Sequence, residues 1–258
     1  MDKKEYDWHL KKVGKFSASC IDKIMSASGK WTQGNISYLY HIQYQRKNKI
    51  PDAEAKSYAM KIGTDNEPYA FEWIKANCSD KNILHCDTDF TEKIFVEIPE
   101  LGYGVSPDGY IVNENAPIKR NEKNEITNHD EIIQNIQSLV EVKCIVGENM
   151  YWMFSDTVPY ERKRISMFAE HRGQMAGQLL AFPSVNSINL MVYLPQVDEN
   201  EYDCDSPIDP RRGLIFHYNR KEFGTYIQEI EDRIRFANDF LTSGKDLDSI
   251  NDFYKIKK

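Results

Sequence analysis

The stretch Leu139-Val140-Glu141-Val142-Lys143-Cys144 places a carboxylate and an ammonium group in a short apolar run and predicts a strand. Side chains of a strand alternate between its two faces, so Glu141 and Lys143 share one face and Val140 and Val142 share the other. Charged groups in such a strand cost free energy unless they are paired or line a polar site. The stretch therefore indicates either an ion pair on an edge strand or one wall of a functional site.

Two further carboxylates precede this stretch in the chain. Asp108 belongs to Ser106-Pro107-Asp108-Gly109, an order that is typical of a type I turn between two strands. Glu67 follows Gly63 at the start of a predicted helical turn, where the helix dipole stabilises an acidic residue. Each residue alone has this ordinary structural explanation. A helix glutamate, a turn aspartate and a Glu-x-Lys strand in that order are more specific than any one of them.

The order of the predicted elements favours an α+β fold. Helices are predicted over residues 17–28, 36–49 and 53–76, the last with a break around Gly63 and Pro68. Short strands are predicted over residues 94–98, 104–106 and 110–112. After the strand at 139–144 come a helix over 162–182, strands over 188–194 and 214–218, and a helix over 221–241. This order predicts a single domain over residues 1–258, with a central mixed sheet flanked by helices.

Polar side chains share one face of the helix predicted over 162–182. His171, Gln174 and Gln178 are spaced so that they lie above one another on that face. Such a row is either a buried polar seam or a set of contacts to a ligand.

Composition and charge exclude several classes of protein. The five cysteines, at positions 20, 78, 86, 144 and 204, form no C-x-x-C pair, which indicates reduced thiols and argues against zinc ribbons and iron–sulfur centres. The histidines show no zinc-binding spacing, and no P-loop or G-x-G-x-x-G is present. No apolar run approaches the roughly 20 residues of a membrane span, and the charged N-terminus does not resemble a secretion signal. We therefore expect a cytoplasmic protein without a membrane partner.

The net charge of −7 is unevenly distributed along the 258 residues. Residues 1–61 carry an excess of six positive charges, and the remaining residues carry an excess of thirteen negative charges. A basic N-terminal region on an acidic body either is a random fluctuation or allows a polyanion to approach one face only.

The three carboxylates and the lysine resemble the PD-(D/E)-x-K nuclease superfamily, which implies the restriction-endonuclease-like fold. Hard divalent ions prefer carboxylate oxygens, and Mg²⁺ binds through one or two carboxylates together with waters and phosphate oxygens. The resemblance implies two Mg²⁺ ions per active site, replaceable by Mn²⁺. Their ligands would be Asp108, Glu141, Glu67 and the Val142 carbonyl. Lys143 would orient or help to deprotonate the attacking water, which makes it catalytic together with the three carboxylates.

The segment Trp8 to Ser19, WHLKKVGKFSAS, resembles the W-H-x-x-R-x-G-x-I/F-T/S-A-S opening of the lambda-type exonuclease (YqaJ-like viral recombinase) family. The resemblance continues through GTDNE at 63–67, SPDG at 106–109, EVKC at 141–144 and QMAGQ at 174–178, over roughly residues 8–195. It implies that Lys12, Ser17 and Ser19 hold a 5′-phosphate, with Ser106 nearby and Gln174 contacting the substrate. A helix N-terminus with hydroxyl groups suits an anion, although simple N-capping by Ser17 or Ser19 is the alternative.

Two departures from the family pattern bear on substrate binding. Lys12 stands where the family has arginine, so a point charge replaces a bidentate fork and Lys11 and Lys15 are expected to share the phosphate. The polar segment 113–137 separates Asp108 from Glu141 and is interpreted as an insertion. It would extend into solvent, bind a partner, or contact DNA through Lys119, Arg120 and Lys123.

The resemblance implies a Mg²⁺-dependent exodeoxyribonuclease that degrades double-stranded DNA ends from 5′ to 3′. It would release mononucleotides and leave a 3′ single strand for phage-type recombination. It also implies a homotrimeric ring and a single-strand annealing protein as partner. The alternatives are a structure-specific or restriction-type endonuclease of the same fold, and a DNA-binding or assembly protein without turnover.

Overall fold

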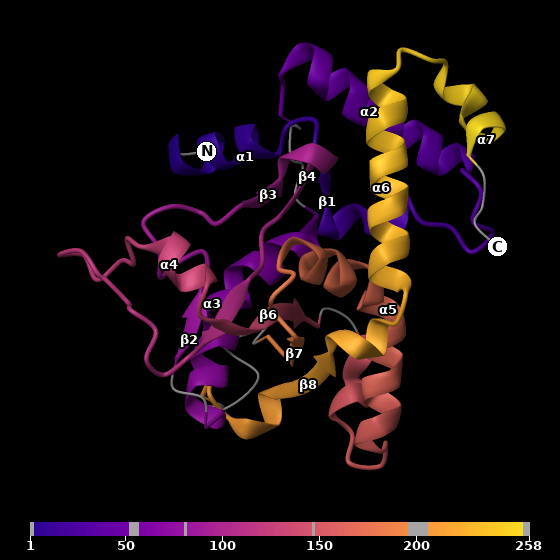
Figure 1. Cartoon of the computed structure of the whole chain (residues 1–258). Coiled ribbons are helices and arrows are strands. Elements are labelled where there is room, and N and C mark those ends of the chain that lie inside the picture. Colours follow the sequence, from indigo (N-terminus) through magenta and orange to yellow (C-terminus); the bar gives the residue numbers. More distant parts are fainter. Residues whose placement is uncertain (1–2, 52–56, 80–81, 146–147, 196–205, 255–258) are drawn as a thin grey trace.

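The computed structural model describes residues 3–51, 57–79, 82–145, 148–195 and 206–254 (Figure 1). A five-stranded sheet has the strand order β2-β5-β6-β7-β8, and a three-stranded sheet has the order β1-β4-β3. The strands of the larger sheet are β2 (Ile83–His85), β5 (Gly109–Val112), β6 (Ile136–Cys144), β7 (Ser187–Tyr193) and β8 (Gly213–Asn219). Those of the smaller sheet are β1 (Phe16–Ser17), β3 (Val96–Ile98) and β4 (Tyr103–Val105).

Helices account for most of the remaining described elements. The α-helices are α1 (Lys3–Lys12), α2 (Gln33–Asn48), α3 (Tyr58–Asn77), α4 (His129–Ile133), α5 (Tyr160–Ala181), α6 (Tyr226–Thr242) and α7 (Ile250–Phe253). The 3₁₀ helices are η1 (Ala18–Lys23), η2 (Pro99–Leu101), η3 (Glu148–Phe154), η4 (Pro210–Arg212), η5 (Arg220–Phe223) and η6 (Leu247–Ser249). In the described part of the chain, none of the helices combines the length and apolarity that crossing a bilayer demands.

The larger sheet is mixed, and β6 lies at its centre. β6 runs parallel to β7 with Glu141 opposite Leu190, whereas the other neighbouring strands of this sheet are antiparallel. The helix α5 connects β6 to β7, as a crossover between parallel strands requires. The pairing with β5 ends at Val140, so Glu141 and Lys143 belong to the central strand of the sheet at a point where β7 alone pairs with it.

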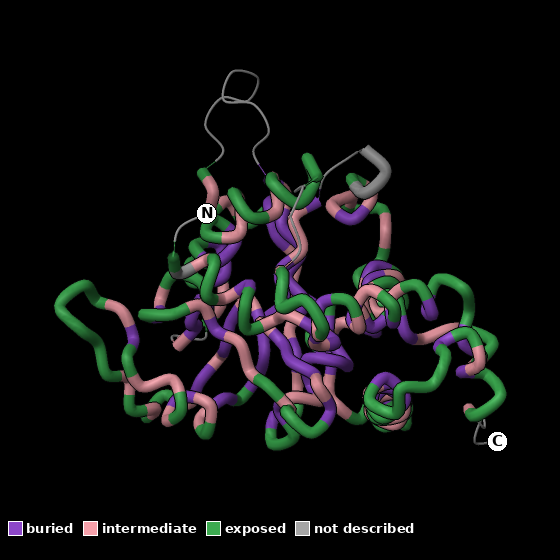
Figure 2. The backbone as a smooth tube through the Cα atoms, turned by 90° about the horizontal axis from the view of Figure 1, so that it is seen from above, coloured by how far each residue is buried: buried purple, intermediate pink, exposed green. Residues whose placement is uncertain are grey.

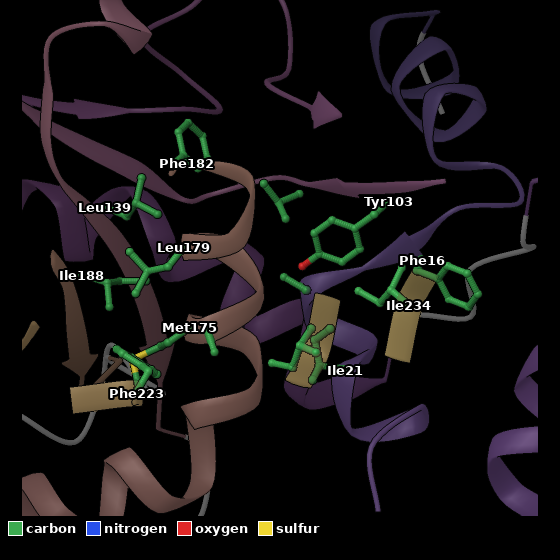
Figure 3. Close-up of a cluster of buried hydrophobic side chains, with 14 of the residues drawn as sticks. Phe16, Ile21, Tyr103, Leu139, Met175, Leu179, Phe182, Ile188, Phe223 and Ile234 are labelled. Atoms are coloured by element: carbon green, nitrogen blue, oxygen red, sulfur yellow. The ribbon is translucent and has the colours of Figure 1, made fainter. Parts of the chain in front are cut away.

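The alternation of β6 decides what covers each face of the sheet. Val140 and Val142 pack in a buried cluster with Phe71 and Ile74 of α3. Leu139 points the other way, into a larger core with Leu179 of α5 (Figure 3). Figure 2 shows the buried segments gathered at the centre of the molecule, with exposed segments around them. A central mixed sheet flanked by helices is therefore confirmed.

The helix α3 continues through the predicted break at Gly63 and Pro68. Pro68 lacks the N–H that would bond the preceding turn, but it lies on the exposed face, where water can satisfy the carbonyl left over. Ser57 caps the helix by accepting a hydrogen bond from the Met60 N–H at 3.2 Å. The predicted start at Ala53 lies outside the described residues, as does Cys204, whereas the other four cysteines are free thiols.

The Pro107-Asp108-Gly109 turn does not close a hairpin. The strand β4 before it pairs with β1 and β3 in the smaller sheet, whereas β5 after it pairs with β2 and β6 in the larger sheet. The chain therefore crosses from one sheet to the other at Asp108. The turn therefore lies between two strands, as the sequence predicts, but these strands belong to different sheets and do not pair with each other.

The predicted helix over 17–28 is shorter than expected. Phe16 and Ser17 form the strand β1, and the 3₁₀ helix η1 ends at Lys23, before Gly29. The polar segment 113–137 reaches out from the larger sheet in Figure 1 and ends in α4. It is anchored by Ile126 and Ile132, which are 1% and 0% exposed.

Candidate active site

Glu141 is the most completely enclosed carboxylate of the site, with 1% of its surface exposed. Its Oε1 accepts hydrogen bonds from Lys143 Nζ and Gln174 Nε2, each at 2.5 Å, and its Oε2 accepts one from Gln178 Nε2. Lys143 Nζ also donates to Gln174 Oε1 at 3.0 Å. A buried carboxylate needs such partners, because an unpaired charge away from water is strongly destabilising. The lysine and the α5 glutamines therefore belong to one network around Glu141.

The two glutamines of the polar face of α5 thus contact Glu141; Gln178 is buried, whereas His171 and Gln174 are half-buried. The face is therefore in part a buried polar seam, and its contact with a ligand stays a prediction. His171 completes that face, and burial and the positive charge of Lys143 lower its pKa to about 4. The imidazole is therefore neutral near pH 7. Gln178 was expected on this face without a role, and the structure shows it to be a direct partner of Glu141.

Asp108 links the crossing between the two sheets to β6. Its Oδ2 accepts a hydrogen bond from the Val142 N–H at 2.7 Å. Burial raises the pKa of Asp108 well above its usual range, and the charges of Glu141 and Glu67 raise it further. Burial lowers the pKa of Lys143, but the carboxylates of Glu141 and Asp108 outweigh burial and leave this pKa raised. Negative charge is therefore in excess at this point, and a bound cation would relieve it.

Glu67 lies in the middle of α3, not in a first turn, and is held by a histidine that sequence reasoning missed. His85 Nε2 is 2.7 Å from Glu67 Oε1, and His85 Nδ1 is 2.8 Å from Thr88 Oγ1. The His85 ring is 3% exposed and stacks on Phe71 with ring centroids 4.2 Å apart. The only signal in the sequence is a histidine that directly follows an apolar pair, Ile83-Leu84, which is too common a pattern to single it out.

A cavity of about 320 Å³, which we call the acidic cavity, brings most of the predicted site residues together. The predicted residues that line it are Lys12, Ser17, Ser19, Glu67, Ser106, Asp108 and Gln174. Glu5 and Asp87 add two further carboxylates to the wall. The predicted residues Glu141, Val142 and Lys143 do not line this cavity, but Gln174 and Asp108 contact both the cavity and these β6 residues.

The predicted phosphate-binding residues lie on the wall formed by α1, β1 and η1. Ser17 Oγ and Ser19 Oγ are 3.2 Å apart, and Ser17 makes no side-chain hydrogen bond as an N-cap. Trp8 Nε1 donates to Ser106 Oγ at 3.2 Å, and Lys12 Nζ lies 3.8 Å from the centre of the Trp8 ring. Simple N-capping therefore does not account for Ser17. Trp8, whose position the sequence pattern includes but whose role it does not indicate, holds both Ser106 and Lys12.

The two lysines expected to share the phosphate with Lys12 are paired with glutamates. Lys11 Nζ is 3.1 Å from Glu92 Oε2, and Lys15 Nζ is 2.7 Å from Glu97 Oε1. Lys11 does not line the acidic cavity, and neither does Lys15. The structure thus leaves Lys12 with the two serines and Ser106 on this wall.

The donor chemistry of the site fits a hard divalent cation. Among the described residues, no three His, Cys, Asp or Glu side chains converge as a ready-made ligand set. Mg²⁺ does not require one, because it usually keeps several waters and binds through one or two carboxylates. Asp108, Glu141 and the Val142 carbonyl would supply that number of oxygens. Gln178 Oε1 is buried without a hydrogen-bond partner in the described structure, and it would accept a hydrogen bond from a water on such an ion.

Comparisons with solved structures identify the fold. The alkaline exonuclease LHK-Exo from Laribacter hongkongensis superposes with a TM-score of 0.60 at 17% identity, over 92% of this chain and 93% of that chain. LHK-Exo in complex with dAMP gives 0.54 at 18% identity, over the same shares of the two chains. A phage-related exonuclease from Haemophilus somnus 129PT gives 0.56 at 17% identity, over 89% of this chain and 95% of that chain. No family model and no curated protein matches this chain.

The likeness extends over about nine tenths of each chain, so most of the described architecture is shared. The chain therefore has the restriction-endonuclease-like fold, as the sequence motifs imply.

Proposed function

We propose that this chain is a Mg²⁺-dependent exodeoxyribonuclease that degrades double-stranded DNA ends from 5′ to 3′. The observation that carries the proposal is one cavity with Asp108 and Glu67 on one wall and Lys12, Ser17 and Ser19 on another. A nuclease that starts at an end needs both groups, the first to cut and the second to hold the terminal phosphate. The named activity of the structural neighbours, exonuclease, agrees with this reading.

The metal ligands in this proposal are Asp108, Glu141, Glu67 and the Val142 carbonyl. Two bound Mg²⁺ ions, or Mn²⁺ in their place, supply activation of a water and stabilisation of the charge on the leaving oxygen. The network around Glu141 holds its carboxylate in a fixed orientation, since three donors contact its two oxygens. His85 does the same for Glu67 through the contact at 2.7 Å.

Lys143 is the catalytic cation of the proposal. Its raised pKa keeps the ammonium protonated at neutral pH. A protonated lysine beside the scissile phosphate orients the attacking water by hydrogen bonding and offsets the negative charge that develops in the transition state. Gln174 bonds both Lys143 and Glu141 and lines the acidic cavity, so it would carry the substrate contact next to them.

The wider biological role is part of the same proposal. We infer that the enzyme releases mononucleotides and leaves a 3′ single strand, which a single-strand annealing protein would receive for phage-type recombination. The protein would act in the cytoplasm of the bacterial host as a homotrimeric ring around the DNA. These features rest on the motifs of the sequence, and mass measurement in solution would test the trimer directly.

A comparison of three duplex substrates tests the proposed activity. In Mg²⁺, linear duplex with a 5′-phosphate should be degraded faster than linear duplex with a 5′-hydroxyl, and closed circular duplex should remain intact. The Lys143→Met variant should lose at least about 100-fold in rate, the size of a typical general acid–base or oxyanion contribution. Lys61→Met, at an exposed lysine of α3, is the matched control and should keep its activity.

Each other outcome has a definite meaning. Cutting of the closed circle would replace end-dependent action by an endonuclease of the same fold. Binding of DNA without hydrolysis in Mg²⁺ or Mn²⁺ would indicate an assembly protein without turnover. Equal rates for Lys143→Met and the unaltered protein would show that the lysine is assigned wrongly.

A further inference from the structure

A second cavity of about 320 Å³ adjoins the acidic cavity and differs from it in charge. We call it the basic cavity. The two cavities share a wall that includes Lys12, Ser17 and Ser19. Its other walls come from the start of β1, from η1 and from α2. Its volume lies at the lower end of the range of about 300–1,000 Å³ that small-molecule sites occupy.

Only basic ionisable groups and a cysteine contribute charge-bearing side chains to this cavity. Among the described residues that line it there is no aspartate or glutamate, whereas the basic or imidazole groups are His9, Lys12, Lys15, Lys23 and His41. The acidic cavity, in contrast, has four carboxylates in its lining, those of Glu5, Glu67, Asp87 and Asp108. The acidic cavity also contains Lys12 and Lys93, but its carboxylates outnumber these lysines, so a phosphate group without a metal ion is attracted more strongly by the basic cavity.

Lys23 is the least compensated cation of the basic cavity. Its Nζ lies 5.4 Å from the centre of the Tyr38 ring, and its side chain is exposed. Lys15, by comparison, is paired with Glu97 at 2.7 Å. Lys23 is therefore the cation best placed to bind an added anion.

Aromatic rings complete the lining of the basic cavity. Tyr38 is half-buried, and its ring stacks on His41 with centroids 6.4 Å apart and an angle of 21° between the planes. Phe16 also packs against Tyr38 in an edge-type arrangement, with centroids 6.2 Å apart. Aromatic faces next to cationic groups are what nucleotide-binding proteins use, because the bases stack and the phosphates pair with the cations.

We propose that the basic cavity is a second nucleotide subsite, in which Lys23 and His41 face the phosphate and Tyr38 faces the base. This proposal rests on the proposed nuclease function, which supplies a nucleotide in the adjoining acidic cavity. The occupant is either the released mononucleotide or a nucleotide of the bound strand. Both sources present the same chemistry, a phosphate and a base, and passage through the shared wall at Ser17 and Ser19 connects them to the site of cleavage.

Binding without metal isolates this subsite from the site of cleavage. In EDTA the acidic cavity lacks the metal ions of the proposed function, and Lys23 lines only the basic cavity, so the part of dAMP binding in calorimetric titration that depends on Lys23 reports on the basic cavity. We expect Lys23→Gln to weaken dAMP binding about tenfold, as removal of one charged hydrogen-bond partner does. Lys30→Gln, an exposed lysine in the loop after η1 and outside both cavities, makes the same change in charge and should bind as the unaltered protein does.

Three further ligands test the roles of the phosphate and of the Tyr38 ring and distinguish the source of the nucleotide. Deoxyadenosine, which lacks the phosphate, should bind at least about tenfold more weakly than dAMP. Tyr38→Leu should weaken dAMP but leave inorganic phosphate unaffected. If dAMP binding depends on Lys23, the released product is the occupant. If only a 5′-phosphorylated oligonucleotide shows that dependence, the occupant is the strand.

The proposal is overturned if neither dAMP nor the 5′-phosphorylated oligonucleotide binds in EDTA. It is also overturned if Lys23→Gln and Lys30→Gln bind these ligands equally well. Degradation of linear duplex in Mg²⁺ is measured on the same preparations. A protein that degrades DNA but binds no nucleotide in EDTA would refute the subsite and keep the proposed function. A protein that binds dAMP through Lys23 but degrades no DNA would keep the subsite and refute the proposed function.

Discussion

Glu141 is held almost entirely out of water, and its oxygens are bonded by Lys143, Gln174 and Gln178. A carboxylate in this position has little freedom to turn, because every rotation breaks a bond to a donor. The orientation of this carboxylate is thus set by α5 as much as by β6. Asp108 and His171 stand at the edge of this network, and each has a pKa that departs from its usual value.

His171 should make the folded protein sensitive to mild acid. Its pKa is lowered from 6.5 to about 4, so the unfolded chain binds a proton that the folded chain refuses between these values. Stability is complete above pH 6.5 and falls as the pH drops toward 4, at most by about 1.4 kcal/mol per pH unit. We expect His171→Gln to flatten this part of the stability curve in urea unfolding. His217→Gln, at an exposed histidine of β8, should leave the slope as it is.

Asp108 should be required for nuclease activity while its charged form lowers the stability of the folded protein. Because its pKa is raised, the folded state binds the proton more tightly than the unfolded state, and stability declines as the pH rises through the raised pKa. Asp108→Asn removes the charge and keeps an oxygen for the Val142 N–H. We expect this variant to be more stable than the unaltered protein at pH 8 in EDTA, by about 1 kcal/mol, while nuclease activity is lost.

Asp156→Asn, at an exposed aspartate before α5, is the control and should change neither property. A lower unfolding midpoint for Asp108→Asn in EDTA would mean that the hydrogen bond to Val142, rather than the charge, dominates at this position.

Glycines in α3 and α5 show how the surroundings of a glycine decide whether it can be replaced by alanine. A Cβ at Gly63 of α3 would meet no atom within 4 Å, so Gly63→Ala should stabilise the helix by up to about 1 kcal/mol. A Cβ at Gly177 of α5 would lie 2.5 Å from the Tyr103 hydroxyl and 3.1 Å from Ala18 Cα in η1. Gly177→Ala should destabilise the protein by roughly 1–3 kcal/mol, because η1 and the buried tyrosine must shift. Thermal unfolding of the two variants should therefore move in opposite directions.

Local sequence patterns predict the positions of helices and strands better than they predict which strands pair and which side chains meet. The alternation of β6 and the polar face of α5 are visible in the sequence, because each depends on residues a few positions apart. The separation of β4 from β5 is not visible. The pairing of β4 with the nearby Val96–Ile98 is local, but its pairing with Phe16–Ser17 joins residues far apart in the chain and leaves no local signal. The same holds for His85, whose role comes from a contact with Glu67 on a different element. The continuity of α3 through Pro68 depends on packing by Phe71 and Ile74, which overrides helix propensity.

At the scale of the whole molecule, Arg233 connects the C-terminal helix α6 to the N-terminal region. Its guanidinium donates to the carbonyls of Ile24, Gly29 and Lys30, and it lies 4.0 Å from the Trp31 ring. The side chain is 2% exposed, so the three carbonyls have no water to replace it. The loop after η1 is therefore held from a residue about 200 positions away.

Arg233→Lys should destabilise the protein by about 2–3 kcal/mol, because an ammonium cannot bond three carbonyls in the plane of a fork. Arg235, two residues further along the same helix, forms an exposed ion pair with Glu231 at 2.7 Å. Arg235→Lys should change stability by less than about 0.5 kcal/mol. Urea unfolding of both variants measures the difference, and equal midpoints would contradict a structural role for Arg233.

The uneven distribution of charge along the sequence corresponds to the different charges of the two cavities. Lys12, Lys15 and Lys23, all from the positively charged first 61 residues, line the basic cavity. Three of the four carboxylates that line the acidic cavity, those of Glu67, Asp87 and Asp108, come from later parts of the chain. The distribution of charge therefore corresponds to two adjoining compartments, and the net value of −7 describes neither of them.

The crossing from the smaller sheet to the larger one takes the chain from Ser106 to Asp108 with only Pro107 between them. In the proposed enzyme, Ser106 lies beside the terminal phosphate and Asp108 beside the bond that is cut. Three consecutive residues, stiffened by a proline ring, then span the interval between those two points. The fixed covalent bond lengths and angles of these residues, which do not change with temperature or salt concentration, would then determine how far from its end a strand is cut.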